Sequence, residues 1–249
     1  MRTIDRALSV FDCFTRAHPS LSLQDISRCV NLPKSTTFRV VQALEARGYL
    51  ARLENQKYSL SFKFVRLAGL VESTLDIRQI GRPVLEKLAR TCNESVTLST
   101  VEGLDRVCVD VVNTPSPLMT LTKPGEHYRL GVGATSLMLI ASLPQPKVNR
   151  VLRSMPRKAG HTRQKVLSAL KTVRKQGYAV SHGGRVAGLS GIAVPVIDAD
   201  GAAQYCLSIV LPTARATDRV PDLIRSALKA GADLSRRLGS PNYNSQEKE

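Results

Sequence analysis

The sequence predicts an α+β protein with a winged helix-turn-helix first and a mixed domain of antiparallel strands and helices after it. Residues 22–60 hold two short helical patterns, a break between them and a hairpin pattern. Residues 95–112 and 192–211 hold paired β-branched runs around turn sequences, with helical patterns between them. The chain has 249 residues, 43% of them hydrophobic, which is enough for two modest cores.

The first helix of the predicted helix-turn-helix begins at a capping sequence. Ser22 places a hydroxyl where a first-turn N–H needs a partner, and Asp25 places a carboxylate at the positive end of the helix. We expect the helix to reach about Cys29. Pro33 then ends it, because proline lacks the N–H and pushes the residue before it towards extended geometry.

The second helix is predicted to begin with Ser35 as its N-cap and to end at Gly48. Phe38, Val41 and Leu44 recur at helical spacing and are expected to face the core. The residues expected to face away from the core are Lys34, Ser35, Thr36, Arg39 and Arg47.

Helical and hairpin patterns flank this pair. A hairpin, the wing, is predicted from Tyr49 to Leu53 and from Lys57 to Leu60. A broadly apolar helix from Phe62 to Ser73 is interpreted as an interdomain linker and a dimer contact. An earlier helix from Thr3 is expected to pack an apolar stripe, and for its Arg2 and Arg6 a phosphate contact and a solvated position both stay open. The stripe consists of Ile4, Leu8, Phe11 and Phe14.

The motifs of this region closely resemble the DNA-binding domain of the IclR family of transcription regulators. The resemblance implies that the second helix enters the major groove and that the wing contacts phosphate or the minor groove. The motifs that carry it are Leu32-Pro33-Lys34-Ser35-Thr36-Thr37, Arg39, Leu44-Glu45, Gly48-Tyr49 and Tyr58-Ser59-Leu60. The DNA-binding residues that it indicates are Lys34, Ser35, Thr36, Thr37, Arg39, Arg52 and Lys57.

The formal net charge of +16 predicts a polyanionic partner or an anionic ligand. Residues 1–62 carry nine Lys/Arg and five Asp/Glu, so most of the excess lies further along the chain. His127 to Ile197 contain twelve Lys/Arg and no Asp or Glu. Most of these cations fall on amphipathic helices and are expected to face solvent.

The five cysteines are widely spaced, with no Cys-x-x-Cys pair and no histidine at metal-ligand spacing. A disulfide framework and a zinc site are therefore not expected, and no cofactor is predicted. The sequence shows no signal peptide and no apolar run of membrane-spanning length, so we expect a cytoplasmic protein with no membrane contact.

The second half reads as strands and helices in alternation. Strands are predicted at Ser95 to Val101, Arg106 to Val112 and Leu118 to Thr122, and a last hairpin lies around residues 198–201. The predicted helices are Asp76 to Cys92, Ala134 to Leu143, Lys147 to Met155, Thr162 to Gln176 and Thr217 to Leu238, and the hairpin strands are Ile192 to Ile197 and Tyr205 to Leu211. The expected domains are residues 1–62 for DNA binding, 63–76 for the linker helix, 77–240 for effector binding and 241–249 for a disordered tail.

This half resembles the GAF-like effector domain of the same family. Asn93 to Leu98 and Gly133 to Ala141 carry the resemblance, together with Gly177-Tyr178, Gly188 and Leu207-Ser208. Ser136 and Leu137 stand where the family usually has glycine and lysine, Gly184 where an acidic residue is common and Val210 where a serine is common. The effector-binding positions that the resemblance implies are Ala134, Thr135, Gly191 and Ser208.

These positions suggest a small carboxylate effector, since they supply hydroxyls and helix-terminal N–H groups. Two alternatives stay open: a neutral aromatic ligand, or a pocket closed by Leu137 and Val210. Gly131-Val132-Gly133 fits an anion-binding helix start or a structural turn, and it lacks the third glycine of a dinucleotide fingerprint.

No catalytic motif is found. The four histidines form no pattern with a serine or cysteine nucleophile, and Ser181-His182-Gly183-Gly184 is interpreted as a loop before a strand. The leading hypothesis is an effector-controlled regulator that binds double-stranded operator DNA as a homodimer or tetramer. Two alternatives are an enzyme or carrier with a degenerate helix-turn-helix, and a nonspecific nucleic-acid-binding protein.

Overall fold

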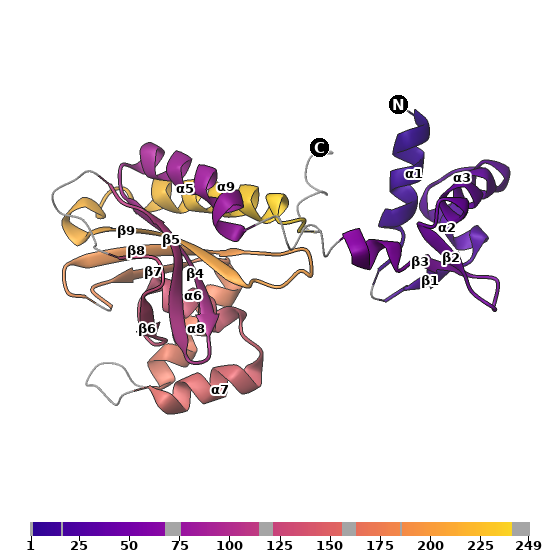
Figure 1. Ribbon diagram of the computed structural model, residues 1–249. Helices are drawn as coiled ribbons and strands as arrows, with labels where there is room; N and C mark the ends of the chain where they lie inside the picture. The colour runs from indigo at the N-terminus through magenta and orange to yellow at the C-terminus, as the bar shows by residue number, and fades with distance from the viewer. Residues whose placement is uncertain are drawn as a thin grey trace. The chain divides into compact units, whose positions relative to one another are not determined.

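The structure is a computed structural model that describes residues 2–15, 17–67, 76–114, 122–155, 163–184 and 186–240. The chain divides into two compact units, Met1–Asp76 and Ile77–Glu249 (Figure 1). The helix and strand content of both units confirms the predicted α+β class.

The first unit is a winged helix-turn-helix. Its elements are α1 (Arg2–Asp12), β1 (Ser20–Leu21), α2 (Leu23–Cys29), α3 (Lys34–Ala46), β2 (Leu50–Arg52) and β3 (Tyr58–Leu60). The predicted hairpin is present as β2 and β3, and β1 adds a strand that the sequence did not indicate, pairing Ser20 with Ser59. A core of fully or almost fully buried side chains joins the three helices to the sheet, namely Val10, Ile26, Val41, Leu50 and Tyr58.

The capping box of α2 is confirmed. The Ser22 Oγ accepts a hydrogen bond from the Asp25 amide at 3.2 Å, and the Ser22 amide donates to the Asp25 Oδ2 at 3.2 Å. The two bonds satisfy orphan amides at the helix start. They set where α2 begins, and therefore where the following turn places α3.

Three expectations for α1 and α3, two about packing and one about capping, were wrong. Ile4 and Leu8 are largely exposed, because α1 turns Val10 into the core instead. Phe38 is 47% exposed, since the buried positions of α3 are Thr37 and Val41. Ser35 is not the N-cap, because α3 already begins at Lys34, with Pro33 in the N-cap position.

Some predictions fall outside the described residues. Residues 63–67 are helical, but the rest of the predicted linker helix, including Val71, lies in the undescribed range 68–75. Residues 115–121, which hold nearly all of the predicted strand Leu118 to Thr122, and the tail 241–249 lie outside as well.

The second unit is a six-stranded antiparallel sheet with helices on both faces (Figure 1). The strands lie in the order β6-β5-β4-β9-β8-β7. The strands are β4 (Ser95–Glu102), β5 (Asp105–Val112), β6 (His127–Arg129), β7 (Ala179–His182), β8 (Leu189–Val196) and β9 (Tyr205–Pro212). The helices are α5 (Ile77–Cys92), α6 (Ala134–Ser142), α7 (Gln145–Ser154), α8 (Arg163–Gln176), the 3₁₀ helix η1 (Thr213–Arg215) and α9 (Val220–Arg237).

Each face of this sheet has its own core. Ile192 and Val194 of β8 pack with α5 and α9, whereas Ala193 between them packs with α6, α7 and α8. This alternation follows from the period of two along a strand. The α6 side carries the smaller strand residues, and it is on this side that the sheet leaves a cavity.

One expectation about the cysteines was wrong. Cys13 and Cys29 are joined in a disulfide, although they are far apart in the sequence, because the end of α1 packs against the end of α2. Cys92, Cys108 and Cys206 are free and buried, as small apolar residues would be.

Candidate DNA interface and effector pocket

Polar side chains at the start of α3 form the first candidate site. Lys34, Ser35 and Arg39 are exposed, and Thr36 is partly exposed. Val41 and Leu44 on the opposite side hold the helix against α1 and α2. The helix therefore presents a cationic and hydroxyl-bearing face to solvent, as expected.

Thr37 does not belong to this face. Its side chain is fully buried, and its Oγ1 donates a hydrogen bond to the carbonyl oxygen of Pro33 at 3.1 Å. This bond holds the first turn of α3 to the preceding break. The structure therefore corrects the assignment of Thr37 to DNA contact, since its hydroxyl is used inside the unit.

The wing supplies two further exposed cations, Arg52 and Lys57. The Arg52 guanidinium lies 5.9 Å from the ring centroid of Tyr58 and donates to the Gln56 side chain. The Lys57 amide donates to the Asn55 Oδ1 at 3.1 Å, which closes the turn. Both side chains are thus carried on a short, hydrogen-bonded hairpin.

The second candidate site is a small cavity of about 50 Å³ in the other unit. It lies between the start of α6 and the sheet, where Gly133 precedes the helix with a φ of 99°. The predicted residues Ala134, Thr135 and Gly191 line it. The other lining residues are Thr97, Ser99, Arg106, Thr122, Val132, Gly133, Ser136, Ser181, Val186, Leu189, Ser190 and Val210.

Ser208 lies behind the cavity wall and not in it. Its side chain is fully buried, and its Oγ accepts a hydrogen bond from the Thr135 Oγ1 at 2.9 Å. The expectation that Ser208 faces the ligand is therefore corrected. Its contact with Thr135 orients a hydroxyl that does line the cavity.

Comparison with known proteins shows which family combines these two units. Residues 3–54 match the IclR helix-turn-helix domain, and residues 70–236 match the bacterial transcriptional regulator IclR C-terminal domain. The chain belongs to the IclR family. It is an effector-controlled, DNA-binding transcription regulator and not an enzyme.

Several members of the IclR family are similar over their whole length. The HTH-type transcriptional regulator XynR of Escherichia coli (strain K12) is 30% identical, with 97% of this chain and 98% of XynR covered. KipR of Bacillus subtilis (strain 168) is 27% identical over 96% and 97% of the two chains. A crystal structure of an IclR transcriptional regulator from Silicibacter sp. TM1040 has a TM-score of 0.87 at 25% identity and covers 96% of this chain and 97% of its own.

Two features of this IclR protein's sites were missed in the sequence. Phe38 is an exposed ring on α3 among polar residues. The spacing of Thr37 to Val41 could have indicated this, because these two residues complete the buried stripe of α3 without Phe38. Arg106 lines the cavity although it is only 8% exposed, and its guanidinium lies 4.7 Å from the ring centroid of Tyr128. The sequence could have indicated this, because Arg106 lies two residues before the buried Cys108 on β5 and therefore faces the same side of the sheet.

The cavity wall contains a buried hydroxyl that no other described residue satisfies. The Thr97 Oγ1 is buried and has no hydrogen-bond partner among the described residues. The Ser181 Oγ, in contrast, accepts from the Ala134 amide at 2.9 Å. The first amide of α6 is therefore already bonded within the protein.

Gly184 and Leu137, where the sequence departs from the family pattern, have different surroundings. A Cβ at Gly184 would lie 3.2 Å from both Cα and N of Gly133, so a side chain there would displace the backbone at the start of α6. Leu137 packs into the core formed with α7 and α8 and does not line the cavity, whereas Val210 does. The pocket is narrowed by Val210 but not closed.

The segment Ser181 to Gly184, interpreted from the sequence as a loop, is partly a strand. Ser181 and His182 end β7. The His182 Nδ1 lies 2.9 Å from the Ser190 Oγ, which donates to the Thr213 Oγ1 at 3.0 Å. This hydrogen-bonded chain joins strand ends beside the cavity.

No helix among the described residues is both long and apolar enough to span a membrane.

Proposed function

We propose that α3 lies in the major groove of operator DNA, with Arg39 directed to a base edge and Lys34 to a phosphate. Ser35 and Thr36 at the helix start donate hydrogen bonds to the DNA backbone. Arg52 and Lys57 bring the wing to phosphate or the minor groove. The observation that carries the proposal is the shared exposure of these cations on α3 and the wing. On the same ground we propose that the protein is cytoplasmic.

Phe38 adds an apolar contact to this docking. Its exposed ring follows the polar first turn of α3, and an aromatic ring in the major groove can contact the methyl group of thymine. Thr37 takes no part, since its hydroxyl is bonded to Pro33.

The test compares a promoter duplex with a scrambled duplex of equal length at several salt concentrations. A sequence-specific regulator protects a defined site and prefers the promoter duplex at every salt concentration. Equal affinity for both duplexes, falling together with salt, would instead identify a nonspecific polyanion-binding protein.

We also propose that the effector is a small carboxylate held in the cavity beside α6. Arg106 carries this proposal, because a guanidinium that is 8% exposed and lines a cavity brings a positive charge close to a carboxylate bound there. The Thr97 and Thr135 hydroxyls lie in the same wall. The small volume of about 50 Å³ favours a short acid over a large aromatic ligand.

Thermal-shift screening tests the charge of the effector. Short carboxylic acids are compared with their uncharged amides, and a ligand at a hundred times its Kd should stabilise the protein by roughly 2.7 kcal/mol. Stabilisation by an acid but not by its amide supports the carboxylate. Stabilisation by neutral aromatics alone contradicts it.

We further propose that the protein binds operator as a homodimer or a tetramer. A single winged helix reads few base pairs, and two copies read two half-sites. The first unit has unpartnered apolar side chains that suit a second copy, with Phe62 89% and Val65 64% exposed. Ile4 and Leu8 of α1 are exposed as well.

Sedimentation of Val65→Glu tests this contact. The matched control is Leu228→Glu, which charges an exposed leucine of α9 in the other unit. We expect monomers and lost operator binding for Val65→Glu, with both properties retained in the control. An intact Val65→Glu dimer would place the contact elsewhere.

A further inference from the structure

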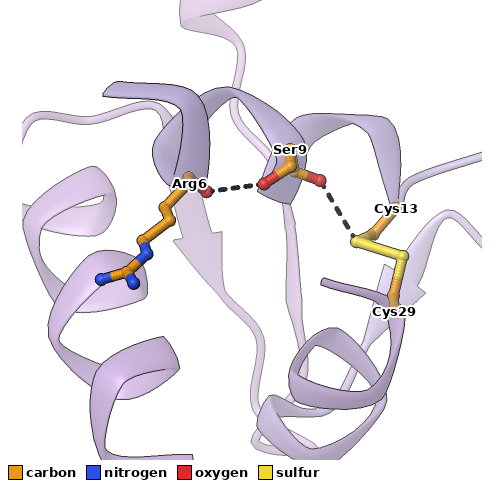
Figure 2. Close-up of a disulfide and its surroundings, with 4 residues drawn as sticks. All are labelled: Arg6, Ser9, Cys13 and Cys29. Carbon is orange, nitrogen blue, oxygen red and sulfur yellow. Dashed lines mark hydrogen bonds between the residues drawn. A yellow bond between two sulfur atoms is a disulfide. The ribbon is translucent and has the colours of Figure 1, made fainter. Parts of the chain in front are cut away.

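The first unit contains a pair of cysteines that its role in DNA binding does not explain. Cys13 follows α1 and Cys29 is the last residue of α2, and their Cα atoms are 6.0 Å apart in the disulfide (Figure 2). The three other cysteines lie in the second unit, where each is buried and free. The two cysteines of the first unit are therefore the ones placed to react with each other.

The surroundings of the pair suit both oxidation states. Cys29 is an exposed residue and Cys13 is a buried one, so Cys29 is the cysteine that a small oxidant in solution meets first. The Sγ of Cys13 lies 3.4 Å from the carbonyl oxygen of Ser9 (Figure 2). When the disulfide is reduced, the Cys13 thiol can donate to this oxygen, so the reduced sulfur has a hydrogen-bond partner in place.

The position of Cys29 connects the pair to the DNA-binding helix. Cys29 comes directly before the break that leads to α3, in which Asn31 adopts a left-handed φ of 51°. The Ser27 Oγ donates to the carbonyl oxygen of Leu32 at 2.7 Å across the same break. A bond from Cys29 to the end of α1 thus fixes α1, α2 and the turn as one support for α3.

We propose that Cys13 and Cys29 form a reversible oxidation site that is reduced in the resting cell and becomes a disulfide on exposure to peroxide. The proposal rests on the proposed operator binding, which places the protein where thiols are kept reduced and where disulfides are usually transient or regulatory. The cross-link stiffens the helix-turn-helix in the geometry that binds DNA.

The chemistry balances with hydrogen peroxide as the oxidant. The Cys29 thiolate attacks one peroxide oxygen, the O–O bond breaks, and Cys29 becomes a sulfenic acid while hydroxide leaves. The Cys13 thiol then attacks the Cys29 sulfur, the S–O bond breaks, and water leaves. Two thiols lose two electrons and two protons, and one peroxide becomes two waters. A dithiol reductant reverses the step by thiol–disulfide exchange.

Two effects of the cross-link follow. It closes a loop between residues separated by 16 positions, which restricts the unfolded chain and should raise the unfolding midpoint of the first unit by on the order of 10 °C. It also removes motions that α1 and α2 would lose on binding, and such preorganisation should tighten operator binding by about threefold or more.

The experiment treats the full-length protein with hydrogen peroxide and then measures thiols and operator affinity. We expect a Cys13–Cys29 peptide cross-link in mass spectrometry, loss of two alkylatable thiols, tighter binding to the operator duplex, and reversal of all three by dithiothreitol. Cys29→Ser should lose all three responses. Cys92→Ala, which removes a buried cysteine of the second unit, should keep them.

Three results would overturn the proposal: no Cys13–Cys29 cross-link at peroxide concentrations that leave Cys92 and Cys108 unmodified, a cross-link that leaves operator affinity unchanged, or an unchanged response in Cys29→Ser. If the reduced protein binds no operator duplex at all, the proposed DNA binding fails instead. The mapped cross-link and the melting shift then still decide whether the oxidation site exists. Cys13→Ser, compared at equal folded fraction by circular dichroism, separates loss of the cross-link from loss of folding.

Discussion

The two units use arginine in opposite ways. Arg39 and Arg52 of the first unit are exposed, whereas several arginines of the second unit form ion pairs with carboxylates. In the second unit, Arg215 and Arg219 bond to a Glu94 side chain that is 1% exposed. Charges left in water remain available for phosphates and are screened by salt, whereas a charge taken out of water must be compensated.

The same contrast separates the two sites. The DNA face is built from residues close in sequence, between Lys34 and Lys57, and its cations are exposed. The cavity beside α6 takes its wall from β4, β5, α6, β7, β8 and β9, and its one described arginine, Arg106, is buried. The first site should therefore respond to salt, and the second to loss of single groups.

The largest effect is expected at the buried carboxylate of Glu94. The Arg215 Nε donates to Glu94 Oε1 at 3.0 Å, and the Arg215 Nη2 donates to Glu94 Oε2 at 2.6 Å. These hydrogen bonds raise the pKa of Arg215 above its usual value. Arg215→Ala leaves Glu94 with Arg219 alone and should lower the free energy of unfolding by on the order of 3 kcal/mol. Urea unfolding measures it.

A matched control is available on the next helix. Arg225 pairs with Asp222 at an exposed position of α9, and such pairs contribute little. Arg225→Ala should therefore cost less than about 1 kcal/mol. Equal losses in both arginine variants would mean that burial of the carboxylate does not set the cost, and the contrast between the units would lose its basis.

Arg106→Gln is expected to have the next largest effect, on effector binding. A buried charge-assisted hydrogen bond is worth roughly 1.5–3 kcal/mol, which corresponds to a tenfold or greater loss of affinity for a carboxylate. Ser208→Ala should weaken binding less, because Ser208 acts only through the Thr135 hydroxyl. Titration calorimetry with the acid found in the screen gives both affinities, and a stronger effect of Ser208→Ala would move the ligand away from Arg106.

At the exposed DNA face, Arg39→Ala should lower the free energy of operator binding by roughly 1–3 kcal/mol and relax the sequence preference at one base pair. Lys34→Ala should weaken all duplexes alike and flatten the dependence of affinity on salt, as expected for a phosphate contact. Anisotropy titrations on matched and scrambled duplexes at several salt concentrations distinguish the two. If neither substitution changes affinity, α3 does not dock as proposed.

The sequence predictions were right where local signals decide the structure and wrong where they do not. Most helix and strand positions were predictable, because capping, proline breaks and alternation are local signals. The short strands β1, β6 and β7 were missed. Thr37 and Phe38 were interchanged because neighbouring residues on a helix differ by only 100° in direction, so a stripe can be drawn through either one.

Long-range contacts could not be predicted in this way. Ser208 and Arg106 both lie on strands whose side chains alternate between the two faces of the sheet. Which of them lines a cavity depends on the position of α6 over the sheet. The pairing of Cys13 with Cys29 depends on the packing of α1 against α2, which no cysteine spacing shows. The exposure of Ile4 and Leu8 depends likewise on which side of α1 meets α3.

The smallest expected effect separates the two helix starts of the DNA-binding unit, and a matched serine pair measures it. Ser22 caps α2, whereas Ser35 lies inside α3 and is exposed. Ser22→Ala should destabilise the first unit by about 1 kcal/mol and leave the contacts of α3 unchanged. Ser35→Ala should leave stability unchanged and weaken operator binding, because its hydroxyl is free to donate to DNA.

The pH dependence of the same pair provides an independent check. The Ser22 side-chain and backbone hydrogen bonds lower the pKa of Asp25 below its ordinary value of 3.8. A lowered carboxyl pKa in the folded state stabilises the protein above that ordinary value, and this stabilisation is lost as the pH falls through the folded pKa. Ser22→Ala should therefore differ from wild type at neutral pH and converge with it in acid, whereas Ser35→Ala should follow wild type throughout. Thermal unfolding between about pH 7 and pH 3 tests this. A constant gap for Ser22→Ala would show that its hydroxyl acts without Asp25, and a stability loss in Ser35→Ala would restore Ser35 as the cap of α3.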